Sequence, residues 1–195
     1  MTDDALLSVA QQTLLTPHAL ELHSLEGVFD RMLAHRLDYA DLYFQYSRSE
    51  SWSLEDGRVK SGSFGIDQGV GVRAVSGDKT AFAYSDDISL SALNNAAQTT
   101  RAIARQGGSR SVSLVAGEPP PSLYLPHDPI AGIKDTDKIA LLERLERHAR
   151  DLDARVIQVM AGLAGEYEVV LVARSDGRLS ADIRPLVRLS LQVIM

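Results

Sequence analysis

The sequence predicts an α+β protein, in which an antiparallel β meander and a second antiparallel β set have long helices packed on one face. Three observations favour this fold class. Apolar residues recur at three- and four-residue steps in some stretches, they alternate with polar residues in others, and Asp-Gly pairs separate alternating stretches. The 195 residues lie between one large domain and two small ones. We expect one domain over 1–195; a division within the connection 107–134 stays open.

Two helices are expected at the start of the chain. The first runs from about Asp3 to Leu14 and is closed by Pro17. The second runs from roughly Leu20 to Arg36. Its apolar face consists of Leu22, Leu25, Val28, Phe29, Met32 and Leu33.

Two further helices are expected later. One follows a cap at Asp86 or Asp87 and continues to about Gln106, with Gly107 at the C′ position. Its inward residues are Leu90, Leu93, Ala96, Ala97, Ile103 and Ala104. The other runs from Asp135 to about Ala154, with a buried stripe of Ile139, Leu142, Leu145, Ala149 and Leu152. Two i,i+4 pairs are assigned to its solvent side, namely Glu143 with Arg147 and Glu146 with Arg150.

The first strand is predicted from strict alternation after residue 41. Polar positions are Ser47, Ser49, Ser51 and Ser53, and the apolar positions between and around them include Leu42, Phe44, Tyr46, Trp52 and Leu54. Arg48 and Glu50 fall on the apolar side, so we expect them where the strand extends beyond its covering elements. Asp56-Gly57 predicts a two-residue hairpin turn, and Val59 to Asp67 is the returning strand.

A glycine-rich stretch, "DQGVGVRAVSGDKTAFAY", has several features of a nucleotide site. Gly69, Gly71 and Arg73 alternate with apolar residues, which places the glycines inside a strand; Ser76 to Lys79 forms a second turn. A phosphate loop and a dinucleotide fingerprint both need their glycines where a strand leads into a helix. We therefore interpret these glycines as positions where another backbone or side chain approaches the sheet closely.

The remainder of the chain is predicted to be mostly β. The connection 107–134 contains five prolines and is expected to have no regular element. After the helix we expect one strand through Ala164, a second from Tyr167 to Arg174, a turn at Asp176-Gly177, and strands on both sides of Pro185. The last strand reaches Met195 without a turn or polar tail, so we expect a piece of a longer protein.

Composition excludes several classes of protein. The chain has no cysteine, which excludes disulfides, thiolate metal sites and a cysteine nucleophile. A net charge of −6 argues against direct nucleic-acid binding. No stretch has the length of a membrane span, and the acidic start does not resemble a signal peptide, so a cytoplasmic location is expected.

No catalytic or metal-binding constellation is evident. The histidines at 18, 23, 35, 127 and 148 lack zincin spacing, no serine lies in a nucleophile elbow, and Asp38 with Asp41 offers too few oxygen ligands for a metal loop. The final hairpin is locally basic, but interleaved aspartates favour a solvated surface over a carboxylate clamp. Its arginines are Arg174, Arg178, Arg184 and Arg188.

Two long stretches resemble the TldD/PmbA family, also called modulators of DNA gyrase. They are "RLDYADLYFQYSRSESWSLEDGRVKSGSFGIDQGVGVRAVSGDKTAFAYSDDISLSAL" and "EYEVVLVARSDGRLSADIRPLVRLSLQVIM". The resemblance implies the amino-terminal region of a cytoplasmic, TldD-type zinc metallopeptidase that acts on unfolded peptides with a TldE/PmbA-like companion subunit. The family's His-Glu-x-x-x-His helix and cysteine ligand belong to a carboxy-terminal half and are absent here. No catalytic residue and no metal ligand are therefore assigned.

Our hypothesis for this region is a chamber wall and subunit interface, with a strand edge near Gly65 to Arg73 for an extended peptide. Arg73, Gly69 and Gly71 are the candidates for substrate- or partner-facing residues. Two alternatives stay open: a free-standing protein-binding module without peptidase activity, and a direct gyrase or DNA effector, against which the net charge speaks.

Overall fold

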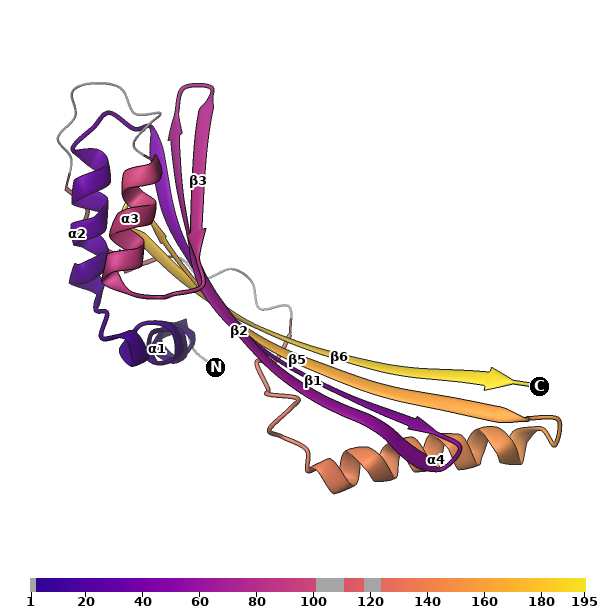
Figure 1. Ribbon diagram of the computed structural model, residues 1–195. Coiled ribbons are helices and arrows are strands. Elements are labelled where there is room, and N and C mark those ends of the chain that lie inside the picture. Colours follow the sequence, from indigo (N-terminus) through magenta and orange to yellow (C-terminus); the bar gives the residue numbers. More distant parts are fainter. Residues whose placement is uncertain (1–2, 101–110, 118–123) are drawn as a thin grey trace. The chain divides into compact units, whose positions relative to one another are not determined.

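The protein is described by a computed structural model over residues 3–100, 111–117 and 124–195 (Figure 1). The α+β fold class is confirmed, because the strands form one mostly antiparallel sheet in the order β3-β2-β1-β5-β6-β4 and helices accompany it. The two strand sets expected from the sequence thus join in a single sheet. The elements are α1 (Asp3–Leu14), η1 (Thr16–His18), α2 (Leu22–Leu33), β1 (Tyr39–Glu55), β2 (Arg58–Ser76), β3 (Lys79–Ser85), α3 (Leu90–Thr100), β4 (Val115–Ala116), α4 (Asp135–Leu152), β5 (Gln158–Arg174) and β6 (Arg178–Ile194).

The residues group into two compact units. The first contains 1–46, 67–123 and 169–183, and the second contains 47–66, 124–168 and 184–195. The long strands β1, β2, β5 and β6 each contribute residues to both units.

The core of the first unit combines two helices with the sheet. α1 begins and ends where the sequence predicted, and the predicted apolar face of α2 is buried except for half-buried Leu22. In α3 the prediction for Leu90 was wrong, since that side chain is 42% exposed and Ile88 is buried instead. The fully buried large side chains here include Leu25, Phe29, Met32, Leu42, Phe44, Leu93 and Leu171.

The cap of α3 also differs from the prediction. Ser89 Oγ accepts a hydrogen bond from Ala92 N at 3.2 Å, so Ser89 is the capping residue and not Asp86 or Asp87. Asp87 supports this cap, because its Oδ2 accepts from Ser89 Oγ at 2.7 Å. The predicted continuation to Gln106, with inward Ile103 and Ala104 and Gly107 at C′, lies outside the described residues.

Two of the predicted turns, Asp56-Gly57 and Ser76 to Lys79, are confirmed in the β1–β2–β3 meander. Asp56 and Gly57 have φ of 47° and 72°, as a type I′ turn requires, and they join β1 directly to β2. Gly77 has φ of 60° and begins the two-residue turn between Ser76 and Lys79. Residues 67–76 of the glycine-rich stretch are thus continuous strand, and β3 follows directly after the turn.

The connection after α3 does contain a regular element, contrary to expectation. β4 pairs in parallel with β6, and Val115 N donates to Gly177 O at 2.8 Å. This contact needs only two residues of extended chain, a length too short for an alternating pattern to reveal.

The carboxy-terminal strands are longer than predicted. β5 is one strand where two were expected, and β6 passes through Pro185 without a break. β4 reaches only Arg178 and Leu179, so in the described sheet β6 has no outer partner at Pro185. A missing backbone N–H is tolerated at such a free edge.

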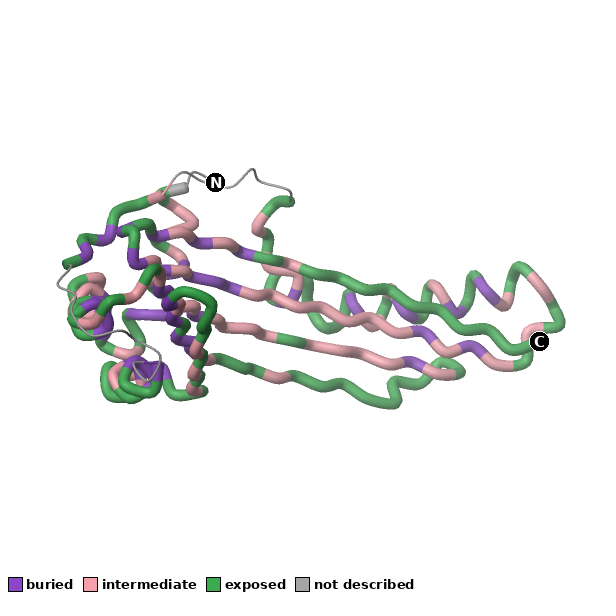
Figure 2. The backbone as a smooth tube through the Cα atoms, turned by 90° about the horizontal axis from the view of Figure 1, so that it is seen from above, coloured by how far each residue is buried: buried purple, intermediate pink, exposed green. Residues whose placement is uncertain are grey.

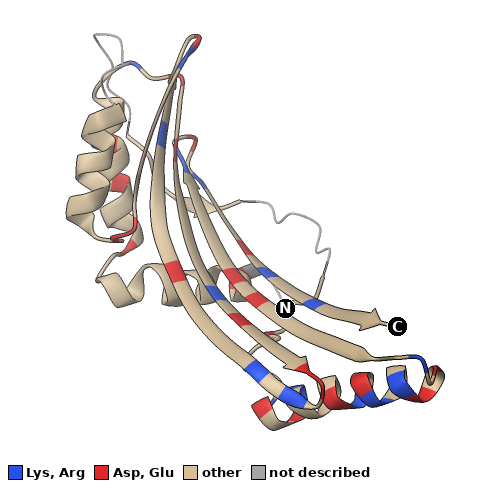
Figure 3. Cartoon of the chain, turned by 45° about the vertical axis from the view of Figure 1, so that its right-hand side comes forward, with Lys and Arg blue, Asp and Glu red and all other residues tan. Residues whose placement is uncertain are grey.

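The second unit has a small core under α4. Leu54, Leu142 and Ala161 are buried there, with Trp52, Leu145 and Leu163 packed against them. Acidic and basic residues follow one another along α4 (Figure 3). Contrary to prediction, Leu152 is 73% exposed and Glu146 is buried. Lys138, which was assigned to neither side of the helix, is also buried.

Candidate functional site

The sequence-predicted site residues all lie in the part of β2 that belongs to the first unit. Arg73 donates from Nε and Nη2 to Oδ2 of Asp41, at 2.8 and 2.5 Å. The carboxylate is buried, whereas the Arg73 side chain is 49% exposed. Arg73 is therefore fixed on one side by a buried charge, and its other side remains open to solvent.

Tyr39 lies next to this ion pair and contacts two cations. The Cζ atoms of Arg73 and Arg174 lie 5.6 and 5.5 Å from the centroid of its ring, which is cation–π geometry. Burial raises the pKa of Tyr39, and the charge of Asp41 raises it further. The phenol is thus held in its neutral form, where its ring can stabilise both guanidinium groups.

Gly69 and Gly71 lie beside β3 with little room for a side chain. A Cβ atom at Gly69 would stand 2.7 Å from Ser85 O, and one at Gly71 would stand 2.8 Å from the Phe82 ring. This agrees with the interpretation that the glycines admit a close neighbour. A substrate- or partner-facing role for Arg73, Gly69 and Gly71 stays a prediction.

An exposed aromatic pair adjoins the arginine. Phe82 and Tyr84 are 62% and 80% exposed, and their rings stack at a centroid distance of 6.5 Å. In the β2–β3 register Phe82 is opposite Arg73, and Tyr84 is opposite Gly71. Because directly opposed residues share a sheet face, arginine and aromatic side chains gather on one surface, a composition typical of interfaces.

Sequence reasoning named Arg73 but missed its neighbours. Asp41 was considered only as a weak cation ligand, and it pairs with an arginine 32 residues away. Asp38 likewise serves the fold, since its Oδ2 accepts from Gly77 N at 2.6 Å. Phe82 and Tyr84 are two residues apart, which puts them on one face of β3, and only the arrangement of strands shows that this face is open.

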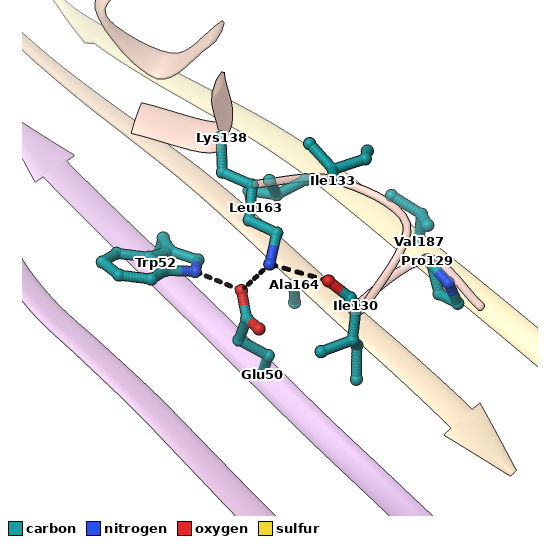
Figure 4. Close-up of a pocket in the computed structure, with 10 residues that line it drawn as sticks. Glu50, Trp52, Pro129, Ile130, Ile133, Lys138, Leu163, Ala164 and Val187 are labelled. Atoms are coloured by element: carbon teal, nitrogen blue, oxygen red, sulfur yellow. Dashed lines mark hydrogen bonds and ion pairs between the residues drawn. The ribbon is translucent and has the colours of Figure 1, made fainter. Parts of the chain in front are cut away.

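The second unit contains a buried ion pair (Figure 4). Lys138 Nζ donates to Glu50 Oε1 at 2.7 Å and to Ile130 O at 3.0 Å, and Trp52 Nε1 donates to the same Glu50 oxygen. The ammonium also pairs with Asp135 at 3.3 Å. Burial tends to lower the pKa of Lys138, but hydrogen bonds to Glu50 and Asp135 outweigh it, so the pKa is raised.

Arg48 and Glu50 were expected beyond the elements covering the strand, and this was wrong. Segment 124–138 lies over both residues, because Arg48 pairs with Asp128 and Glu50 pairs with Lys138. Arg48 also lies over the ring of Tyr167, with Cζ 5.5 Å from the centroid. Arg48 and Glu50, on the apolar side of β1, thus bind segment 124–138 to the strand through ion pairs.

The basic final hairpin agrees with the solvated-surface interpretation. Arg174 and Arg178 both contact Asp176, at 2.8 and 3.9 Å, and Arg184 contacts Glu168 at 3.4 Å. Arg188, in the outer part of β6, is exposed. Two carboxylates, Asp176 and Glu168, thus form ion pairs with three of these four arginines.

A zinc ion does not fit the part of the chain that the structure describes. There, no group of three or more His, Asp or Glu side chains could hold a metal ion, and the sequence contains no cysteine. His23 contacts Glu21 at 3.1 Å, which is a surface pair and not a metal cluster. None of the described helices is long and apolar enough to cross a bilayer.

Family profiles cover both halves of the chain. Residues 40–104 match PmbA/TldA metallopeptidase domain 1, and residues 128–195 match the PmbA/TldA metallopeptidase central domain. The chain belongs to the TldD/PmbA family. Members named metalloprotease TldD homolog are similar over nearly its whole length: 48% identity for the protein of Haemophilus influenzae and 37% for that of Buchnera aphidicola subsp. Schizaphis graminum, each over 97% of this chain. The chain spans only about two fifths of these TldD homologues, 40% and 39%.

Solved structures of similar fold agree with this TldD/PmbA assignment. A protein from Bacteroides thetaiotaomicron, described as a modulator of DNA gyrase, superposes with a TM-score of 0.64 at 17% identity, over 88% of this chain and 40% of its own. TldE from Thermococcus kodakarensis gives a TM-score of 0.58 at 15% identity, over 88% and 38%. At these identities the likeness concerns the fold alone.

Proposed function

We propose that this chain is the amino-terminal, non-catalytic part of a cytoplasmic, TldD-like zinc metallopeptidase that degrades or processes unfolded peptides. The observation that carries the proposal is the match to the first and central domains, combined with coverage of only about two fifths of relatives named metalloproteases. The described residues provide no zinc ligand set. In this proposal the zinc and the bond-breaking groups belong to the remaining three fifths of the full-length protein.

The chain's own contribution would be a chamber wall, a subunit interface and peptide docking. The surface formed by Arg73, Phe82 and Tyr84 supports the interface role, because it combines exposed aromatic residues with a half-exposed arginine side chain. A TldE/PmbA-like subunit is the proposed partner. β3 pairs with β2 only from Val70 to Ser76, so the earlier part of β2 has no outer partner in the described sheet and supports strand-edge docking.

Zinc-dependent cleavage of an unstructured peptide tests the proposal. We expect turnover by the full-length protein with its companion subunit, loss of that turnover on chelation, and none from this chain alone. Turnover by this chain that responds to zinc would overturn the non-catalytic role. Absence of zinc-dependent turnover by the full-length pair would overturn the peptidase assignment.

Arg73→Ala in the full-length protein tests the interface. We expect weaker subunit pairing or slower peptide turnover, because the substitution removes the half-exposed arginine side chain. Arg58→Ala is the matched control, since Arg58 is an exposed arginine of the same strand. If pairing and turnover are both intact in Arg73→Ala, the assignment of Arg73 is wrong.

A further inference from the structure

An open cleft in the first unit lies between β3 and α3 and has a volume of about 400 Å³. On the strand side it is lined by Tyr84 and Ser85, and Asp87 follows them. On the helix side its polar lining residues are Ser91, Asn95 and Thr99. We refer to it as the β3–α3 cleft. Arg73 and its neighbours Asp41 and Tyr39 do not line this cleft.

β3 can accept a further strand on the side of this cleft. It is the terminal strand of the sheet and pairs only with β2 among the described strands. The register begins with Ser76 opposite Lys79 across a two-residue turn, so these residues form a hydrogen-bonded pair. Since such pairs alternate with non-bonded ones, the N–H and C=O groups of Thr80, Phe82 and Tyr84 point away from β2.

α3 provides a polar wall along this edge. Ser91, Asn95 and Thr99 follow one another at four-residue steps, so they form one stripe of the helix, and all three are exposed. Ala92 and Ala96 lie beside this stripe and also line the cleft. Their small side chains leave room, while the hydroxyl and amide groups can bond a chain lying between helix and strand.

The charge of the cleft is negative. Of the described residues that line it, Asp87 alone carries a formal charge at neutral pH. Its Oδ2 accepts from Ser89 Oγ, which fixes the carboxylate at the end of the cleft where β3 stops. A cationic side chain is complementary to this position, and an acidic one is repelled.

We propose that the β3–α3 cleft binds an extended peptide as an added strand along β3, with a Lys or Arg side chain at Asp87. Backbone hydrogen bonds to Phe82 and Tyr84 hold the main chain, and the α3 stripe accommodates small or polar side chains. Binding in this cleft requires no metal, because backbone hydrogen bonds and the Asp87 carboxylate provide the contacts. It selects basic, extended segments by charge and by backbone geometry.

Fluorescence anisotropy of labelled octapeptides on the 195-residue chain tests the binding mode. The probe is a Ser/Thr/Val peptide with one central Lys; the comparison peptides carry Glu at that position or N-methyl groups on alternate amides. N-methylation removes the donors of one edge, so we expect binding to weaken at least about tenfold in one of the two N-methyl registers. We expect the Glu peptide to bind about threefold or more weakly than the Lys peptide. Equal binding of both N-methyl registers and the parent peptide would overturn the proposal.

Variants of the chain test the location. Tyr84→Pro removes an outward N–H that β2 does not use, so binding should be lost, whereas Tyr84→Ala keeps that donor and should retain most of it. Asp87→Asn should remove the preference for Lys over Glu, and Asp86→Asn, an exposed neighbour outside the cleft lining, should keep it. Circular dichroism of each variant checks folding.

Tyr84→Pro that folds and binds normally would show that the edge of β3 is not the site. The chain could instead form a dimer in which a second copy occupies the cleft. A dimer that dissociates in Tyr84→Pro would therefore overturn the peptide assignment.

Discussion

Lys138 Nζ lies 2.7 Å from Glu50 Oε1, and only 4% and 12% of the two side chains are exposed. The pair joins the first turn of α4 to the middle of β1 within the second unit. Trp52 Nε1 and Ile130 O complete the hydrogen bonding around it. Two charges with so little water around them depend on each other, because either one alone would be buried without compensation.

Lys138→Met should therefore destabilise the protein by about 3–5 kcal/mol, since it leaves the Glu50 carboxylate buried and unpaired. Glu50→Gln combined with Lys138→Met should recover much of this loss. Urea unfolding followed by circular dichroism measures both. Lys134→Met is the control, since that lysine is exposed and makes no cap bond, and it should change stability by less than about 0.5 kcal/mol. Equal effects of the two lysine substitutions would contradict a structural role for the pair.

The same pair predicts a loss of stability at alkaline pH. The folded-state pKa of Lys138 is raised by Glu50 and Asp135 against the effect of burial. The contribution is therefore fully present below the unfolded pKa, about 10.4, and is lost as pH rises through the folded pKa. Burial also raises the pKa of Tyr39 and Tyr167, which adds in the same direction. We expect unfolding free energy to be nearly constant from pH 7 to about 9.5 and to fall above about 10.5, with the difference between wild type and Lys138→Met shrinking there. A difference that stays constant up to pH 11 would argue against this origin.

Glu146 should be far more important than its helix neighbour Glu143. Glu146 is buried, its Oε2 accepts from Gly57 N at 2.6 Å, and its Oε1 contacts Arg150 Nε at 3.2 Å. Removing it deprives the β1–β2 turn of an acceptor, so Glu146→Ala should cost about 2 kcal/mol. Glu143→Ala, at an exposed position, should stay within about 0.5 kcal/mol. Thermal and urea unfolding of the two variants makes the comparison, and similar losses would refute the assignment of Glu146 as the turn's acceptor.

Patterns of neighbouring residues predicted the helices, strands and turns well. The predictions failed where a residue's position depends on a partner far away in the sequence. The bounds of α1 and the turn at Asp56-Gly57 depend on residues adjacent in sequence, and both were correct. Glu146 was assigned to the solvent side of its helix and Lys138 was given no role, but their partners Gly57 and Glu50 lie 89 and 88 residues away. The periodicity of a helix indicates which residues face the core, but it does not indicate partners so distant in the sequence.

The same distinction applies to the candidate site. Alternation placed Arg73 on a strand and identified its glycine neighbours as close-approach positions. It gave no sign of Asp41 as the partner of Arg73, because two strands must be in register before the residues meet. The β3–α3 cleft was also inaccessible to sequence reasoning. Its lining comes from the free edge of one element and one face of another.

The glycines of β2 make the last prediction, because they differ in what an added methyl group would meet. At Gly69 the obstacle is Ser85 O, a backbone atom of the paired strand, so Gly69→Ala should cost about 2–3 kcal/mol. At Gly71 the obstacle is the ring of Phe82, which is 62% exposed and can move aside. Gly71→Ala should therefore cost about 1 kcal/mol or less, and Phe82→Ala in the same chain should remove most of that cost. Phe82→Ala should not rescue Gly69→Ala. Chemical unfolding of the two single and two double variants measures these costs. An equal loss of stability at both glycines would show that the backbone of β3 moves aside as easily as the Phe82 side chain.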